Sequence, residues 1–91
     1  MLRIAVEEEH GWATLRVQGL LAGDWVKELE RCWHETLVSP DQIVIDLDNV
    51  LFIDTRGRAL LEVMHAAGSH LHGKGVHTAY ILEQIQEAKV V

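Results

Sequence analysis

The stretch that begins at Ile43 and ends at Gly57 reads Ile-Val-Ile-Asp-Leu-Asp-Asn-Val-Leu-Phe-Ile-Asp-Thr-Arg-Gly. The part from Gln42 to Leu47 is nearly continuous in β-branched and aliphatic residues, which is typical of a central strand covered on both faces. A short apolar loop is predicted to follow. Asp54 then occupies a helix N-cap position, where its carboxylate accepts hydrogen bonds from backbone N–H groups near Gly57. A buried strand that leads into a helix start predicts an α/β protein.

Two runs before this stretch alternate between apolar and polar residues, one centred on Ile4 and the other on Leu15. A period of two is that of half-buried strands, and the short connection through His10-Gly11 predicts an antiparallel hairpin. Asp24 is then expected to cap an amphipathic helix that ends near Ser39-Pro40. The buried face of this helix is predicted to carry Val26, Leu29, Trp33 and Leu37.

The remainder of the chain predicts a second helix and a last strand. The second helix carries Leu60, Leu61, Met64, Gly68 and Leu71 on one face, and Gly73 and Gly75 are expected to end it. Val76 to Leu82 is predicted to be a strand, and Glu83 to Val91 a short terminal helix or a frayed tail. The order β-β-α-β-α-β plus a short C-terminal helix predicts a single α/β domain over residues 1–91. Its mixed sheet should have about four strands with helices packed on it.

The composition of the chain argues against several classes of binding partner and cellular location. The formal net charge is −6, which is the wrong sign for binding nucleic acid or an anionic membrane surface. No run approaches the roughly 20 apolar residues of a membrane helix, and Glu7, Glu8 and Glu9 stand where a signal peptide would be apolar. The single cysteine, Cys32, cannot form an internal disulfide. We therefore expect a soluble, cytoplasmic protein with no nucleic-acid partner and no direct membrane insertion.

Motifs for catalysis or metal binding are weak. Gly68 to Lys74 has the spacing of a phosphate-binding loop, but Gly75 stands where Ser or Thr would hold magnesium, and a turn at a helix end is the better interpretation. On a helix, His70 and His72 would point roughly 200° apart. His65 and His72 would share a face about 10 Å apart, too far for one zinc ion. We expect no metal, no cofactor and no enzymatic activity, and we interpret Cys32 as a buried structural thiol.

Two residues after Asp54 are not explained by helix capping. Arg56 places a cation in the first helical turn, against the macrodipole, and Gly57 is poor helix material by about 1 kcal/mol relative to Ala. A charged residue followed by a residue without a side chain indicates a surface that another group approaches closely. Trp12 and Trp25 border predicted loops, where partly exposed indole rings would suit an interface.

The sequence resembles the STAS domain family, the fold of bacterial anti-sigma factor antagonists. The family has an aliphatic strand ending in Asp-Leu, then Phe-Ile-Asp-Ser-Ser-Gly and a leucine-rich helix. This chain has Val44-Ile-Asp-Leu47, then Phe52-Ile-Asp-Thr-Arg-Gly57, then Ala59-Leu-Leu61. The family's upstream element, Gly-x-Leu-Asp, corresponds to Gly19-Leu-Leu-Ala22. The resemblance extends over essentially the whole chain, although family members usually have a longer final helix.

The resemblance implies a role in partner switching. In such antagonists, a kinase that is also an anti-sigma factor phosphorylates the second Ser of the motif, and the added charge weakens their complex. In this chain Arg56 occupies that position and Ala22 replaces the acidic residue of the upstream element. Both departures count against an ordinary phosphorylation switch. Thr55 is the only hydroxyl left in the motif, either as a substitute phosphorylation site or as a residue beside the helix cap.

We therefore expect a non-enzymatic protein-interaction module in a bacterial regulatory circuit. Its partner would be a protein similar to the anti-sigma factor kinases. The alternative is a STAS accessory subunit of an ATP-driven lipid transporter, whose partner would be the transporter ATPase. An enzyme or nucleotide-binding protein is a third reading, and a homodimer is compatible with either binding role. The predicted contact surface consists of Ala22, Gly23, Asp24, Asp54, Thr55, Arg56, Gly57 and Arg58.

Overall fold

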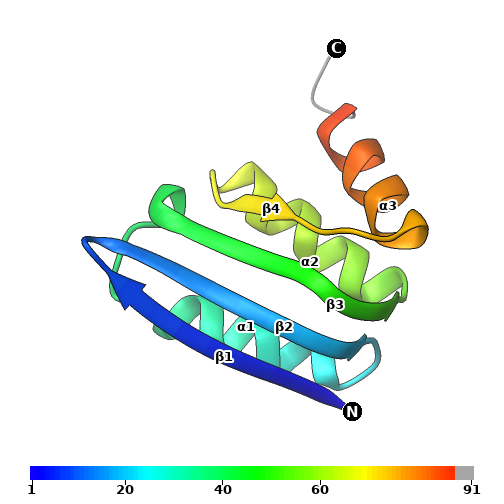
Figure 1. Ribbon diagram of the computed structural model, residues 1–91, viewed down its shortest axis with the longest axis horizontal. Coiled ribbons are helices and arrows are strands. Elements are labelled where there is room, and N and C mark those ends of the chain that lie inside the picture. The colour runs from blue at the N-terminus through cyan, green and yellow to red at the C-terminus, as the bar shows by residue number, and fades with distance from the viewer. Residues whose placement is uncertain (88–91) are drawn as a thin grey trace.

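The computed structural model describes residues 1–87 as a four-stranded sheet with three α-helices (Figure 1). Part of the segment 83–91, predicted to be a helix or tail, lies outside the described residues. The elements in chain order are β1 (Leu2–Glu9), β2 (Trp12–Leu21), α1 (Trp25–Glu35), the 3₁₀ turn η1 (Pro40–Gln42), β3 (Ile43–Ile53), α2 (Thr55–Ala66), β4 (His70–His72) and α3 (Val76–Glu87).

The sheet has the spatial order β1-β2-β3-β4 and is mixed. β1 and β2 form the predicted antiparallel hairpin, in which Ile4 faces Val17, while β2–β3 and β3–β4 are parallel pairs. His10, in the turn of the hairpin, has a positive φ of 54°, as a tight connection requires. The α/β class and the four-stranded mixed sheet with packed helices are thus confirmed.

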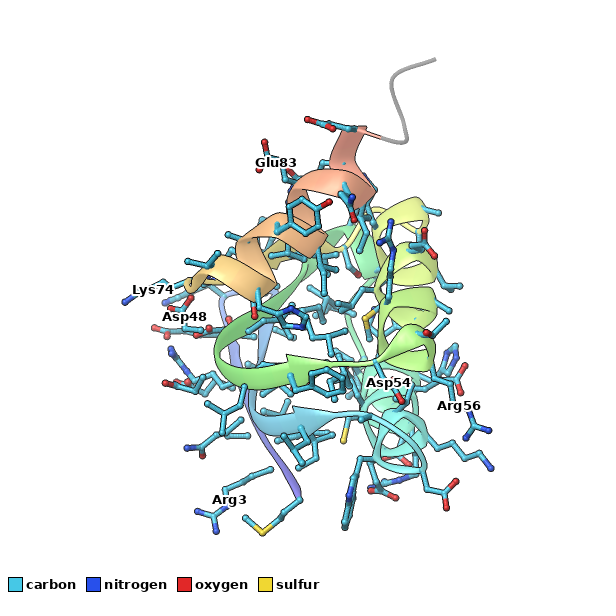
Figure 2. All side chains as sticks on the ribbon, turned by 90° about the vertical axis from the view of Figure 1, so that its right-hand side faces the viewer. Arg3, Asp48, Asp54, Arg56, Lys74 and Glu83 are labelled. Carbon is cyan, nitrogen blue, oxygen red and sulfur yellow. The ribbon has the colours of Figure 1, made fainter. Side chains whose placement is uncertain are left out.

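The helices leave one face of the sheet open. α1 and α2 lie on the same face, and α3 lies beyond the β4 edge (Figures 1 and 2). The strands alternate accordingly, because Ile43, Ile45 and Leu47 are fully buried in the core whereas Val44 points to the other face and is only partly buried. The prediction that this strand is covered on both faces is therefore wrong for the described residues.

The helix α1 buries Val26, Leu29 and Trp33, as its periodicity predicts. It ends at Glu35, earlier than expected, and Leu37 lies beyond it with 91% of its surface exposed. Asp24 occupies the N-cap position, but its side chain makes no capping hydrogen bond because its backbone is already helical, with φ −68° and ψ −18°. The predicted capping role of Asp24 is therefore wrong.

The strand β3 is longer than predicted, because the expected apolar loop after Leu47 continues it as far as Ile53. Two register shifts against β2 accommodate this length, one of them between Gly19 and Leu20. Val50 and Ile53 are buried, and the intervening Leu51 and Phe52 are exposed. These irregularities break the alternation of buried and exposed residues that a regular strand shows.

The C-terminal third differs most from the prediction. α2 buries Leu60, Leu61 and Met64 but ends at Ala66, and Gly68 turns the chain with a φ of 99°. Leu71 is buried in the short strand β4, not on α2. The predicted last strand at 76–82 is the first part of α3, whose buried residues Thr78, Ile81, Leu82 and Ile85 follow helical spacing. No described helix is long and apolar enough to cross a membrane.

Candidate protein-interaction site

Asp54 connects the two segments that the sequence predicts to form one surface. Its Oδ1 accepts a hydrogen bond from the backbone N–H of Gly57 at 2.8 Å, which is the predicted cap of α2. Its Oδ2 accepts a second one, also 2.8 Å, from the N–H of Gly23 in the turn between β2 and α1. One carboxylate therefore holds the start of α2 and the start of α1 together.

These hydrogen bonds favour the ionised form of Asp54. The pKa of its carboxyl lies below the ordinary value, chiefly because of the Gly57 and Gly23 N–H donors and, to a smaller extent, the nearby Arg56 guanidinium. Gly23 takes part with a φ of 58°, in the left-handed region that glycine adopts most readily. The carboxylate therefore stays charged at neutral pH and fixes the shape of the surface.

Arg56 extends from the first turn of α2 into solvent on the helix-bearing side of the molecule (Figure 2). Its side chain is 68% exposed, and its Nη1 lies 3.9 Å from Oδ1 of Asp24. The acidic neighbour offsets part of the cost of placing a cation against the helix dipole. An exposed pair at this distance is weak, so the guanidinium remains accessible to another carboxylate or phosphate.

Gly57 has an intramolecular explanation. It is buried, and a Cβ atom there would collide with the carbonyl oxygen of Leu21 and press against the side chain of Ile53. The close approach inferred from sequence is thus made by the protein's own β2. Gly57 therefore lies beneath the predicted contact surface, packed against β2, and offers little exposed area to a partner.

Thr55 and Arg58 differ in placement. Thr55, the first residue of α2, is exposed. Arg58 turns to α3, where its Nη1 donates to Oε1 of Gln84 at 2.7 Å, and its Nε lies 3.9 Å from Glu62. The structure therefore brings Gly23, Asp24, Asp54 and Arg56 together, while Arg58 links two helices.

Apolar surface adjoins this charged group. Trp25 is 45% exposed and lines a shallow hollow with Ala22, Gly23, Asp24 and Glu28. A second hollow, between α1 and α2, is lined by Arg56, Leu60 and the exposed Val63 among others. The exposure expected for Trp25 from its position beside a loop is confirmed. Val63 was not recognised from the sequence, where it reads as an ordinary exposed helix position.

The open face of the sheet carries a different polar cluster. Ligand atoms of Asp46, Asp48 and His72 lie within 4.8 Å of one another, since His72 lies on β4 and not on a helix as predicted. Arg16 Nη1 is 3.2 Å from Asp46 Oδ2, and Lys74 Nζ is 4.0 Å from Asp48 Oδ2. These cations already offset the carboxylate charge, so the cluster is explained as a cross-strand ionic network.

Two other sequence motifs take no part in a site. The stretch Gly68 to Lys74 contains β4 and is therefore not a single phosphate-binding loop. Cys32 is partly buried on α1 and lies in a hydrogen-bonded turn whose carbonyl accepts from Thr36. Burial raises the pKa of its thiol, which disfavours a nucleophilic role.

Comparison with known proteins supports the fold and leaves the family open. The chain is similar to a solved structure described as "Crystal Structure Analysis of Mglu", with a TM-score of 0.60 and 20% identical residues. The match covers 79% of this chain and 19% of that one, so the chain spans about a fifth of its length. Similarity at this level concerns the fold alone. No protein-family model and no curated protein matches the sequence.

Proposed function

We propose that the chain is a non-enzymatic protein-interaction module, a STAS-like domain similar to the anti-sigma factor antagonists of bacterial regulatory circuits. The observation that supports this proposal most directly is the double hydrogen bond of Asp54 to Gly23 and Gly57. It joins the two segments to which the resemblance assigns the contact surface. A surface fixed before binding loses little entropy when the partner docks.

The partner offers an acidic group to Arg56. Positive potential at the start of α2 and the exposed guanidinium act in the same direction there. Because an arginine stands where the antagonists carry their phosphorylated serine, the complex is constitutive and not released by phosphorylation at this position. Trp25 supplies an aromatic anchor beside the charged group.

Affinity capture from a bacterial lysate, compared between the parent protein and Arg56→Ala, tests this function. A captured kinase-type anti-sigma factor supports the proposal, whereas a transporter ATPase supports the alternative STAS role. The purified pair is then measured by calorimetry. Arg56→Glu should weaken the complex by about 2–5 kcal/mol if the charged pair is buried.

The controls follow from the geometry. Arg56→Glu also places a second carboxylate beside Asp24, so its circular dichroism must match that of the parent protein before affinities are compared. Lys74→Glu makes the same charge change on the opposite side of the molecule (Figure 2) and should bind normally. If Arg56→Ala and Arg56→Glu bind the captured partner as tightly as the parent, this surface is not the interface.

A further inference from the structure

The strand β1 is an uncovered edge of the sheet. It pairs only with β2 among residues 1–87, so its outer side presents backbone N–H and C=O groups without partners there. The opposite edge is protected, because β4 has three residues and α3 lies beyond it (Figure 1). A long unpaired edge is a template for another strand.

The backbone determines which residues of β1 can pair outwards. The carbonyl oxygen of Met1 accepts from the N–H of Leu20 at 2.9 Å, so Met1 directs its hydrogen-bonding groups at β2. Because these directions alternate along a strand, the even-numbered residues from Leu2 to Glu8 direct theirs outwards. In an added antiparallel strand, outward residues must pair with outward residues.

The side chains of β1 divide into two sets. Arg3 and Glu7 lie on the open face, where Glu7 forms an ion pair with Arg16. Arg3 has no ion-pair partner within residues 1–87. On the other face Ile4 packs against the core only in part, and Val6 remains 50% exposed. The edge therefore carries a free cation and uncovered apolar surface.

We propose that β1 pairs antiparallel with β1 of a second copy of this chain, in a register centred on Ala5. In that register Arg3 of each copy faces Glu7 of the other, and Ile4 faces Val6. The ion pair and the apolar pair each form twice because the arrangement is two-fold symmetric. The two four-stranded sheets would then form one continuous sheet of eight strands. This proposal is independent of the proposed function.

Other arrangements that satisfy the backbone are less favourable. A register centred on Ile4 places Arg3 opposite Ala5, and one centred on Val6 places Ile4 opposite Glu8. Parallel pairing brings the run Glu7–Glu9 of both copies together, which is repulsive. Three glutamates on an edge otherwise protect it from association. The Ala5-centred register places Leu2 opposite Glu8, but of these registers it alone sets Arg3 opposite Glu7 and Ile4 opposite an apolar residue at the same time.

Sedimentation velocity of the whole chain and of charge variants tests the dimer. The parent protein should sediment as a dimer, and Arg3→Glu should raise the dissociation constant by about tenfold or more, since two attractions become two repulsions. Glu7→Arg should act likewise, and a mixture of the two variants should form a heterodimer in which every such pair is again complementary. Lys74→Glu, at the opposite edge, should dimerise normally.

Cross-linking tests the register. Ala5 faces its own copy at a non-hydrogen-bonded position, where Cβ atoms are about 4.5–5.5 Å apart, so Ala5→Cys in a Cys32→Ser background should form an intermolecular disulfide under mild oxidation. Arg3→Cys in the same background should not. A monomeric parent protein, an Arg3→Glu variant as dimeric as the parent, or equal cross-linking at both positions would overturn the proposal. If Glu7→Arg does not fold, Arg3→Glu and the cysteine pair decide it.

Discussion

Gly57 in the first turn of α2 packs directly against the carbonyl oxygen of Leu21 at the end of β2, with no room between them for a Cβ atom. The same carbonyl accepts a hydrogen bond from the N–H of Asp54 at 3.2 Å. The helix start and the strand end are therefore joined through their backbones. Asp54, at this junction, also accepts a hydrogen bond from the N–H of Gly23.

Gly57→Ala should destabilise the protein. Helix propensity alone would favour alanine by about 1 kcal/mol, but overpacking against a backbone atom costs about 1–3 kcal/mol and the carbonyl of Leu21 has little freedom to move. We expect a net loss in the free energy of unfolding, measured by urea denaturation. Arg56→Ala, in the same turn but exposed, controls for changes in the helix itself. A Gly57→Ala protein as stable as the parent would show that the contact can relax.

The elements that are predicted well from sequence are those whose hydrophobic pattern fits only a strand or only a helix. The hairpin follows from strict alternation around Ile4 and Leu15, and the helix faces follow from residues such as Leu29 and Leu61. The C-terminal third was mispredicted because residues 76–82 form a short, largely apolar run that fits a strand or a helix equally well. Packing of Ile81 and Leu82 against the core decides in favour of α3, and sequence contains no such information.

In the candidate site, too, some contacts could be predicted from the sequence and others could not. The cap of α2 by Asp54 was predicted because donor and acceptor are three residues apart. The second hydrogen bond of Asp54, to Gly23, joins residues 31 positions apart and could be seen only in the folded chain. The Asp24 neighbour of Arg56 is also a consequence of the fold. The Asp54 cap was predictable from local sequence, whereas the contacts that assemble the surface were not.

Ser69→Ala should cost about 1–3 kcal/mol of stability. The Ser69 hydroxyl accepts from the indole Nε1 of Trp33 at 2.9 Å and donates to the carbonyl of Pro40 at 2.7 Å, in a buried position. Its removal leaves both groups without a partner. Ser39→Ala, the same change at an exposed position, is the matched control and should alter urea denaturation little. Equal midpoints for the two variants would contradict the prediction.

Cys32 should react slowly with disulfide reagents in the native protein. Burial raises the pKa of its thiol, and the thiolate is the reactive form. At pH 8 the native rate should therefore be lower than the rate in denaturant. The pH at which the reaction rate reaches half its maximum should also be higher for the native protein than for the unfolded chain. Stopped-flow absorbance measures both profiles, and identical pH dependence in the two states would show that the thiol is not desolvated.

Asp54 should make stability depend on pH in the acid range. Its pKa is lowered in the folded protein by the Gly57 and Gly23 N–H groups, so its stabilising contribution is fully present above the unfolded value of about 3.9. The contribution is then lost as pH falls through the folded pKa. The difference in urea midpoint between the parent protein and Asp54→Asn should accordingly be largest near neutral pH and shrink below about pH 4. Asp24→Asn removes the same charge from the neighbouring segment without breaking either hydrogen bond, and so controls for net charge. A difference between parent and Asp54→Asn that is constant from pH 7 to acid would mean that the carboxylate does not hold the two helix starts together through its charge.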